Sequence, residues 1–219
     1  MNQAHPLSGQ RGRRRRLLQQ MAAGVAGGIL GVLQQAWAAQ PETIRQGVRS
    51  VRGTVLVNGE PARVGTLVPP GATVVTQRAS EVTYVVGEDA FLQRANARVQ
   101  IDGAARVFRV VTGALLSVFG RGNPATIHMP VATAGIRGTG CYIQVEARRT
   151  YFCLCYGGME LTPAGGQTRA YSTTHHESPL WIADGKVEPA GMLNHEDTEL
   201  ALLENLVGRQ VPFAIPYTR

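Results

Sequence analysis

The chain has 219 residues, of which 44% are hydrophobic and 17% charged, the composition of an ordinary soluble globular protein. Its formal net charge of +7 suggests nucleic-acid binding, but five of its 22 basic residues lie within residues 1–38, which contain no Asp or Glu. The rest of the chain carries 17 basic and 15 acidic residues, a net charge of +2. We therefore expect no nucleic-acid partner, since such binding depends on a concentrated Lys and Arg surface.

The amino terminus has the layout of a secretory signal. An arginine-rich tract at residues 11–16 precedes an apolar stretch at 21–33, and Ala36 and Ala38 supply a small-residue cleavage pattern. The arginines and the two leucines that follow them resemble the twin-arginine export pattern. We expect residues 1–38 to direct the chain to the periplasm. Contact with a membrane is expected only through an uncleaved signal, whose apolar run is shorter than the roughly 20 residues that span a bilayer.

The next part of the chain has the pattern of short β-strands. After an expected linker at residues 39–50, runs of alternating apolar and polar residues are separated by Gly, Asn-Gly or Asp-Gly turns. Asn58-Gly59 favours the positive backbone angles of a tight hairpin. The expected strands are residues 51–57, 73–76, 82–86, 91–101, 107–111, 114–119, 141–146 and 150–156. The fold class that this predicts is all-β, with hairpins stacked into a sandwich or a short β-solenoid.

The carboxyl-terminal part is predicted to contain a short helix. Residues 157–191 are rich in Gly, Thr, Ser and Pro, so we expect loops with one or two brief strands there. Asn194 can cap a helix in which Glu196 and Asp197 are favourable charges in the first turn. Its apolar positions recur at three- and four-residue spacing and are Leu200, Leu203, Leu206 and Val207. Gly208 marks its end.

Residues 51–145 resemble the FecR domain, the periplasmic domain of the bacterial iron-dicitrate regulator and its relatives. The matching features are the run 53–59, then Gly65 and Gly71, then Ser80-Glu81-Val82, and above all the run 130–139, which ends in Arg137-Gly138-Thr139. The resemblance implies a periplasmic domain of stacked hairpins at residues 51–160, which leaves residues 161–219 as an extension with a loop and the helix. Only twenty residues precede the apolar stretch that begins at Met21, so we expect no cytoplasmic anti-sigma segment before it. We therefore expect a stand-alone exported relative of the regulator.

The three cysteines, Cys141, Cys153 and Cys155, lie in one expected hairpin that turns at residues 147–149. Cys153 and Cys155 project from the same side of their strand, because side chains alternate along a strand. If the loop has three residues, Cys141 lies opposite Cys155 and all three sulfurs share one face. A loop that is one residue longer or shorter separates them.

Several kinds of chemistry fit that cysteine face. Cys141 can form a cross-strand disulfide with Cys153 or Cys155, as suits an oxidising compartment. The three thiolates with a histidine from His175, His176 or His195 can bind zinc or copper(I). The thiols can also be buried and inert, or one can act as a nucleophile beside a histidine. Of the adjacent His175 and His176, at most one is expected to reach the sulfurs.

The signature turn Arg137-Gly138-Thr139 predicts a tight backbone path, with a carboxylate-binding role for Arg137 as a second hypothesis. The chain shows no paired carboxylates and no spacing typical of a catalytic triad, so we do not expect an enzyme. The sequence thus predicts a non-catalytic binding or sensing module with a protein partner in the cell envelope. The alternative is a metal-binding or redox-sensing protein that uses the cysteine and histidine cluster.

Overall fold

The structure of the protein is a computed structural model that describes residues 44–102 and 106–214, all of which belong to one compact unit. The early strands are β1 (Gly47–Arg52), β2 (Val55–Val57), β3 (Glu60–Pro61), β4 (Thr73–Thr76), β5 (Glu81–Val86), β6 (Asp89–Gln93) and β7 (Arg98–Asp102). The later strands are β8 (Val107–Val118), β9 (Ala125–Met129), β10 (Ala132–Val145), β11 (Thr150–Pro163), β12 (Arg169–Thr173), β13 (Leu180–Ala183) and β14 (Lys186–Pro189). Helix α2 (Asp197–Leu206) follows them.

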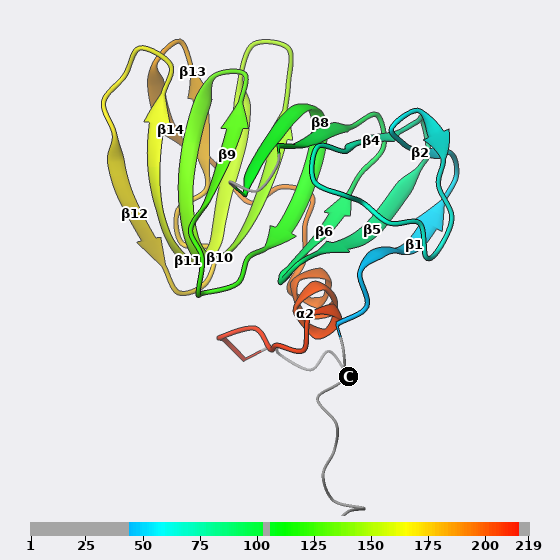
Figure 1. Ribbon diagram of the computed structural model, residues 1–219. Helices are drawn as coiled ribbons and strands as arrows, with labels where there is room; N and C mark the ends of the chain where they lie inside the picture. Colours follow the sequence, from blue (N-terminus) through cyan, green and yellow to red (C-terminus); the bar gives the residue numbers. More distant parts are fainter. Residues whose placement is uncertain (1–43, 103–105, 215–219) are drawn as a thin grey trace, which may run out of the picture. The chain divides into compact units, whose positions relative to one another are not determined.

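The strands form one sheet of neighbouring hairpins, which confirms the predicted all-β class with a short carboxyl-terminal helix (Figure 1). The strand order along its main path is β14-β13-β11-β10-β9-β8-β7-β4-β2-β3. A side branch leaves this path at β8, where β6 pairs with β8, β5 with β6, and β1 with β5. Strand β12 pairs with β11. The pairs are antiparallel except for β8 and β9. The described residues include no helix long and apolar enough to cross a membrane.

The Asn58-Gly59 turn is confirmed. Asn58 and Gly59 have φ angles of 53° and 88°, and they join β2 to β3. Two successive positive φ angles give the turn the right-handed twist that antiparallel strands need.

The long strands β10 and β11 have a hydrophobic core on each face. Ile143, Phe152 and Leu154 face a core built mainly from β4 to β10, whereas Tyr142 and Cys153 face a second core beneath α2. Alternation along a strand makes this division unavoidable, because each residue points to the face opposite its neighbour's. Burial of each large apolar side chain stabilises the fold by about 1.5–3 kcal/mol.

The β10–β11 hairpin does not have the predicted three-residue loop. Val145 pairs with Thr150, so the loop has four residues, and the backbone N–H of Glu146 donates to the carbonyl of Arg149. The additional residue shifts the register, and Cys141 lies opposite Leu154 and not Cys155. The condition under which all three sulfurs share one face is therefore not met, because a shift of one residue moves a side chain to the other face.

The sheet extends beyond both predicted ends of the β domain. Strand β1 begins at Gly47, inside the expected linker at residues 39–50. Strand β11 continues to Pro163, and β12, β13 and β14 follow where mainly loop was predicted. Strands β12 and β14 are short and mostly exposed, so their sequence lacks a clear apolar alternation.

Helix α2 packs against β6 and β8 (Figure 1). Leu200 and Leu203 are fully buried in the second core, as their spacing predicts. The cap is Glu196 and not Asn194, because Glu196 and Glu199 form a reciprocal capping box in which each side chain bonds to the other's backbone N–H. Asn194 has a positive φ of 50° in the segment before the cap.

Candidate metal centre

Cys153 and Cys155 lie on the face of β11 that α2 covers. Both are free thiols with no exposed surface, and they project from the same side of the strand, as their i, i+2 spacing requires. Two sulfurs are thus held next to each other in a buried setting by the most extensively paired strand hairpin of the described residues.

Cys141 belongs to the opposite core. Its Sγ lies 3.3 Å from Ser117 Oγ, and its thiol is also free and buried. The predicted disulfide from Cys141 to Cys153 or Cys155 is not formed. The register of β10 and β11 puts Cys141 on one face of the sheet and the other two cysteines on the opposite face. For the same reason, Cys141 cannot bind a metal ion together with the other two cysteines.

His176 reaches the two cysteines from the loop between β12 and β13. Its backbone N–H donates to the carbonyl of Cys155 at 2.9 Å, which ties the loop to β11. Its Nδ1 lies 3.4 Å from Cys153 Sγ. The Glu177 carboxylate closes the loop by accepting hydrogen bonds from the hydroxyls of Thr173 and Thr174.

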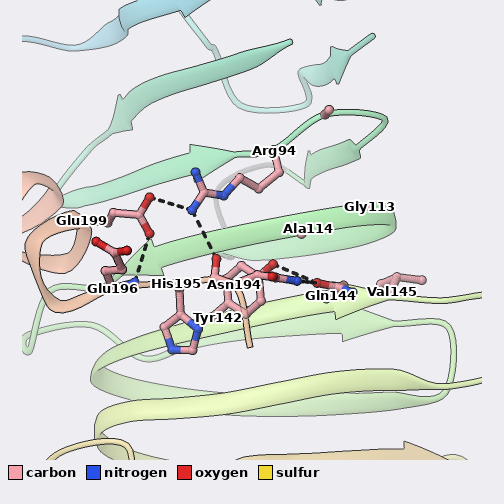
Figure 2. A pocket seen from close by; sticks show the side chains of 11 residues that line it. Arg94, Gly113, Ala114, Tyr142, Gln144, Val145, Asn194, His195, Glu196 and Glu199 are labelled. Carbon is pink, nitrogen blue, oxygen red and sulfur yellow. Dashed lines mark hydrogen bonds and ion pairs between the residues drawn. The ribbon is translucent and has the colours of Figure 1, made fainter. Parts of the chain in front are cut away.

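His195 approaches the same place from the segment before α2. Its ring stacks on Tyr142 with centroids 4.6 Å apart, and its Nδ1–H donates to the carbonyl of Leu193. Figure 2 shows this segment beside a surface cavity, where Arg94 bonds to the carbonyl of Asn194 and to Glu199 of α2. The position of His195 therefore depends on the docking of α2.

Four ligand atoms converge at this point. Cys153 Sγ, Cys155 Sγ and one ring nitrogen each of His176 and His195 all lie within 4.8 Å of one another. The two facing nitrogens, His176 Nδ1 and His195 Nε2, are 3.2 Å apart. Two sulfurs and two imidazole nitrogens form the donor set of a tetrahedral structural zinc site.

A second group of ligand atoms adjoins the first. Asp197, the first residue of α2, accepts hydrogen bonds from His175 Nε2 at 2.9 Å and from His176 Nε2 at 3.0 Å. His175 does not contact the cysteines, and its side chain is 43% exposed. Of the two adjacent histidines, it is thus His176 that lies at the sulfurs.

The electrostatics favour a thiolate at Cys153. A hydrogen bond from the Cys155 thiol, with further bonds from His176 and His195, lowers the pKa of Cys153 to about 4 in spite of its burial. Burial raises the pKa of Cys155 well above its ordinary value, and the neighbouring thiolate adds to this effect. Burial alone acts to lower the pKa of His176, but Cys153 and Asp197 together raise it. A thiolate is the form of cysteine that binds a metal.

The structure also places the residues of the signature turn. Gly138 has a φ of 60° within an irregularity of the β10–β11 pairing, and Thr139 Oγ1 donates to the carbonyl of Gly158 at 2.8 Å. These residues thus form an irregularity within strand β10 and not a turn between strands. Arg137 is exposed beside Arg121 at a surface cavity, and its carboxylate-binding role stays a prediction. The predicted signal at residues 1–38, with Ala36 and Ala38, lies outside the described residues.

Sequence reasoning missed two residues at the site. Asp197 was interpreted only as a favourable charge in the first turn of the helix, and Met192, whose Sδ lies 3.9 Å from Cys153 Sγ, was not considered. No local signal could have identified the role of Asp197, because it orients His175 and His176, which lie 22 and 21 residues before it in the chain.

No protein-family model matches the chain, and no curated protein matches it. Two crystal structures, at 1.65 and 2.50 Å resolution, of a protein from Parabacteroides distasonis ATCC 8503 proposed to be an anti-sigma factor are similar to part of it. Each has 10% sequence identity to this chain and a TM-score of 0.47, over 60% of this chain and 64% of the other. The chain thus spans less than two thirds of the length of that protein.

Proposed function

We propose that this chain is a non-catalytic zinc-binding protein of the bacterial envelope, with one ion held by Cys153, Cys155, His176 and His195. The observation that carries the proposal is the convergence of two sulfurs and two ring nitrogens, from three separate segments, within 4.8 Å of one another. Buried thiols without a partner are common. Two thiols that face two imidazole nitrogens form a complete ligand set.

The spacing of the donor atoms suits a zinc ion. With Zn–N bonds of about 2.0–2.1 Å and Zn–S bonds of about 2.3 Å, a tetrahedron places two nitrogens about 3.3 Å apart and a sulfur and a nitrogen about 3.5 Å apart. The corresponding distances are 3.2 Å between His176 Nδ1 and His195 Nε2, and 3.4 Å between Cys153 Sγ and His176 Nδ1. A central ion therefore needs little movement of the ligands.

The outer partners of both histidines support the same interpretation. The Asp197 carboxylate can only accept, so it holds a proton on His176 Nε2. The other nitrogen, Nδ1, faces the sulfurs and can exchange its hydrogen bond with Cys153 for a bond to an ion. The Leu193 carbonyl fixes the opposite tautomer of His195, and its Nε2 lone pair points to the same centre. Two lone pairs that face each other at 3.2 Å need a proton or a metal ion between them. Such oxygen partners are typical of metal-binding histidines.

A cysteine nucleophile is the rival interpretation. Hydrogen bonds link Cys153 to His176 and His176 to Asp197, in the order nucleophile, base and carboxylate of a catalytic triad. A nucleophile must approach the substrate carbon to about 3–3.5 Å. Cys153 is fully buried in the second core, and neither it nor Cys155 lines any of the surface cavities described above. We therefore propose that the chain has no enzymatic activity.

The proposed setting is the periplasm. It is supported by the signal-like segment at residues 1–38 and by the resemblance of residues 51–145 to the FecR domain. Twin-arginine export carries folded proteins, so zinc can be bound before the chain leaves the cytoplasm. A protein partner in the envelope is part of this proposal. Cell fractionation of the full chain tests the location, and a product retained in the cytosol with its arginine tract contradicts it.

The zinc site is tested by the metal content of the purified full chain and by cobalt substitution. We expect one zinc per chain, and a thiolate-to-cobalt charge-transfer band with tetrahedral ligand-field absorption after exchange. The double variant Cys153→Ser, Cys155→Ser should lose the bound zinc and the thiolate-to-cobalt charge-transfer band. Cys141→Ser is the matched control, because this buried thiol lies on the other face and should leave both signals intact.

Three results would contradict the zinc site. The first is a folded wild-type chain with no affinity for zinc or cobalt, and the second is a charge-transfer band that depends on Cys141. The third is a preference for copper(I) over zinc at matched free concentrations, which would assign the cluster to a soft-metal site instead.

A further inference from the structure

The group formed by His175, His176 and Asp197 lies directly outside the proposed zinc site, on which the following inference rests. One ring nitrogen of each histidine and a carboxylate oxygen of Asp197 lie within 4.8 Å of one another. Two imidazoles and one carboxylate are ligands for a divalent ion of intermediate softness such as Zn²⁺, with further positions left for water. The group is therefore a second, more weakly binding ligand set.

Exposure decreases from this outer group to the inner one. The exposed fraction of the side chain is 43% for His175, 22% for Asp197 and 8% for His176, and both cysteines are fully buried. An ion in solvent thus meets the outer group before it can reach the sulfurs. No movement of the sheet is needed for this first contact.

His176 belongs to both groups through different nitrogens. Its Nε2 lies 3.0 Å from Asp197 in the outer group, and its Nδ1 lies 3.4 Å from Cys153 Sγ in the inner group. A neutral imidazole has one lone pair, so it serves one of the two groups at a time. An ion bound outside uses Nε2. Once the tautomer changes, Nε2–H bonds to Asp197 again and Nδ1 is free for the inner ion.

We propose that His175, His176 and Asp197 form an outer metal site that captures a divalent ion and passes it to the inner site through His176. The transfer exchanges ligands without a redox change. The ion leaves His175, Asp197 and His176 Nε2 and gains His176 Nδ1, His195 Nε2 and two thiolates, and the Cys155 thiol proton is released to solvent. Since the two sites share one imidazole, the chain holds one tightly bound ion and not two.

The rate of metal uptake tests this route. In stopped-flow mixing of the metal-free full chain with Co²⁺, the charge-transfer band reports arrival at the sulfurs. His175→Ala should slow its appearance about tenfold, because the exposed capture site is lost. The equilibrium affinity of the inner site should change little, since His175 contributes no inner ligand. His128→Ala, a histidine on β9 bonded to Thr133, is the matched control and should load at the wild-type rate.

A second measurement isolates the outer site. The Cys153→Ser, Cys155→Ser variant should still bind Co²⁺ weakly, with ligand-field absorption but no thiolate band. Adding His175→Ala should abolish this binding. Because the readout is spectroscopic and the two inner sulfurs are absent, the result does not depend on transfer.

The outcomes separate the two proposals. If the wild-type chain binds Co²⁺ at its thiolates and His175→Ala loads at the same rate, the capture route is overturned while the zinc site stands. If Met192→Leu slows uptake and His175→Ala does not, the ion passes the exposed thioether beside Cys153, and the capture route is again overturned. If the wild-type chain shows no thiolate band, the zinc site itself fails.

Discussion

His176 Nδ1 and His195 Nε2 lie 3.2 Å apart, although the two residues belong to different segments on either side of β13 and β14. The loop that carries His176 is tied to β11, whereas His195 precedes the helix that covers the second core. A metal ion between these nitrogens would join the sheet to its carboxyl-terminal helix. Metal binding and the docking of α2 should therefore stabilise each other.

Removal of zinc should lower the thermal stability of the chain. At free zinc 100 times above the dissociation constant, a site formed only in the folded state contributes about 2.7 kcal/mol. For a domain of this size we expect a difference in Tm of about 5–11 °C between the zinc-loaded and chelated protein. Differential scanning calorimetry measures it. Cys153→Ser, Cys155→Ser should show no such difference, and an equal shift in that variant would contradict a site at these sulfurs.

The metal-free chain should contain one thiolate at neutral pH. The pKa of Cys153 is lowered to about 4, whereas burial raises that of Cys141 to about 12, despite its hydrogen bond with Ser117. The ultraviolet absorbance of the thiolate should thus be present at pH 7 and decline as the pH falls through about 4, where Cys153 gains a proton. Cys153→Ser should remove this step and Cys141→Ser should keep it. A midpoint near 9 would show that Cys155 and the histidines do not stabilise the Cys153 thiolate.

The sequence was sufficient to predict the all-β class, the Asn58-Gly59 hairpin and the apolar face of α2. These features depend on local signals, namely alternation along strands, positive φ at a turn and helical spacing of leucines. The pairing register of β10 and β11 does not depend on such local signals. One additional loop residue put Val145 opposite Thr150 and moved Cys141 to the other core, and nothing in residues 146–149 distinguishes a loop of three from one of four.

The site could be predicted only in part. The spacing of Cys153 and Cys155 was enough to place their sulfurs on one side, and the adjacent histidines were evident candidates. The choice of His176, the approach of His195 and the role of Asp197 depend on how two loops and a helix dock on the sheet. These contacts join residues far apart in the chain, so they cannot be predicted from the sequence of any single segment.

Arg94 should contribute more to stability than its neighbour Arg52. Both contact Glu81, but Arg94 also bonds to Glu199 of α2, and its side chain is 26% exposed against 75% for Arg52. We expect Arg94→Ala to lower the free energy of unfolding by about 1–2 kcal/mol, because two carboxylates lose a charged donor. Arg52→Ala should have no measurable effect. Urea unfolding of both variants decides the matter, and equal losses would mean that the link to α2 adds nothing.

The docking of α2 can be tested with two consecutive leucines. Leu203 is fully buried in the second core, whereas Leu202 is 50% exposed. Leu203→Ala should cost about 2–5 kcal/mol, since it removes buried surface and leaves a cavity, whereas Leu202→Ala should stay within about 0.5 kcal/mol of the wild type. Because His195 lies just before the helix, Leu203→Ala should also weaken cobalt binding, and Leu202→Ala should not. If both variants unfold and bind cobalt alike, the helix does not cover the cysteine face of β11 in solution, and His195 has no fixed position from which to bind the ion.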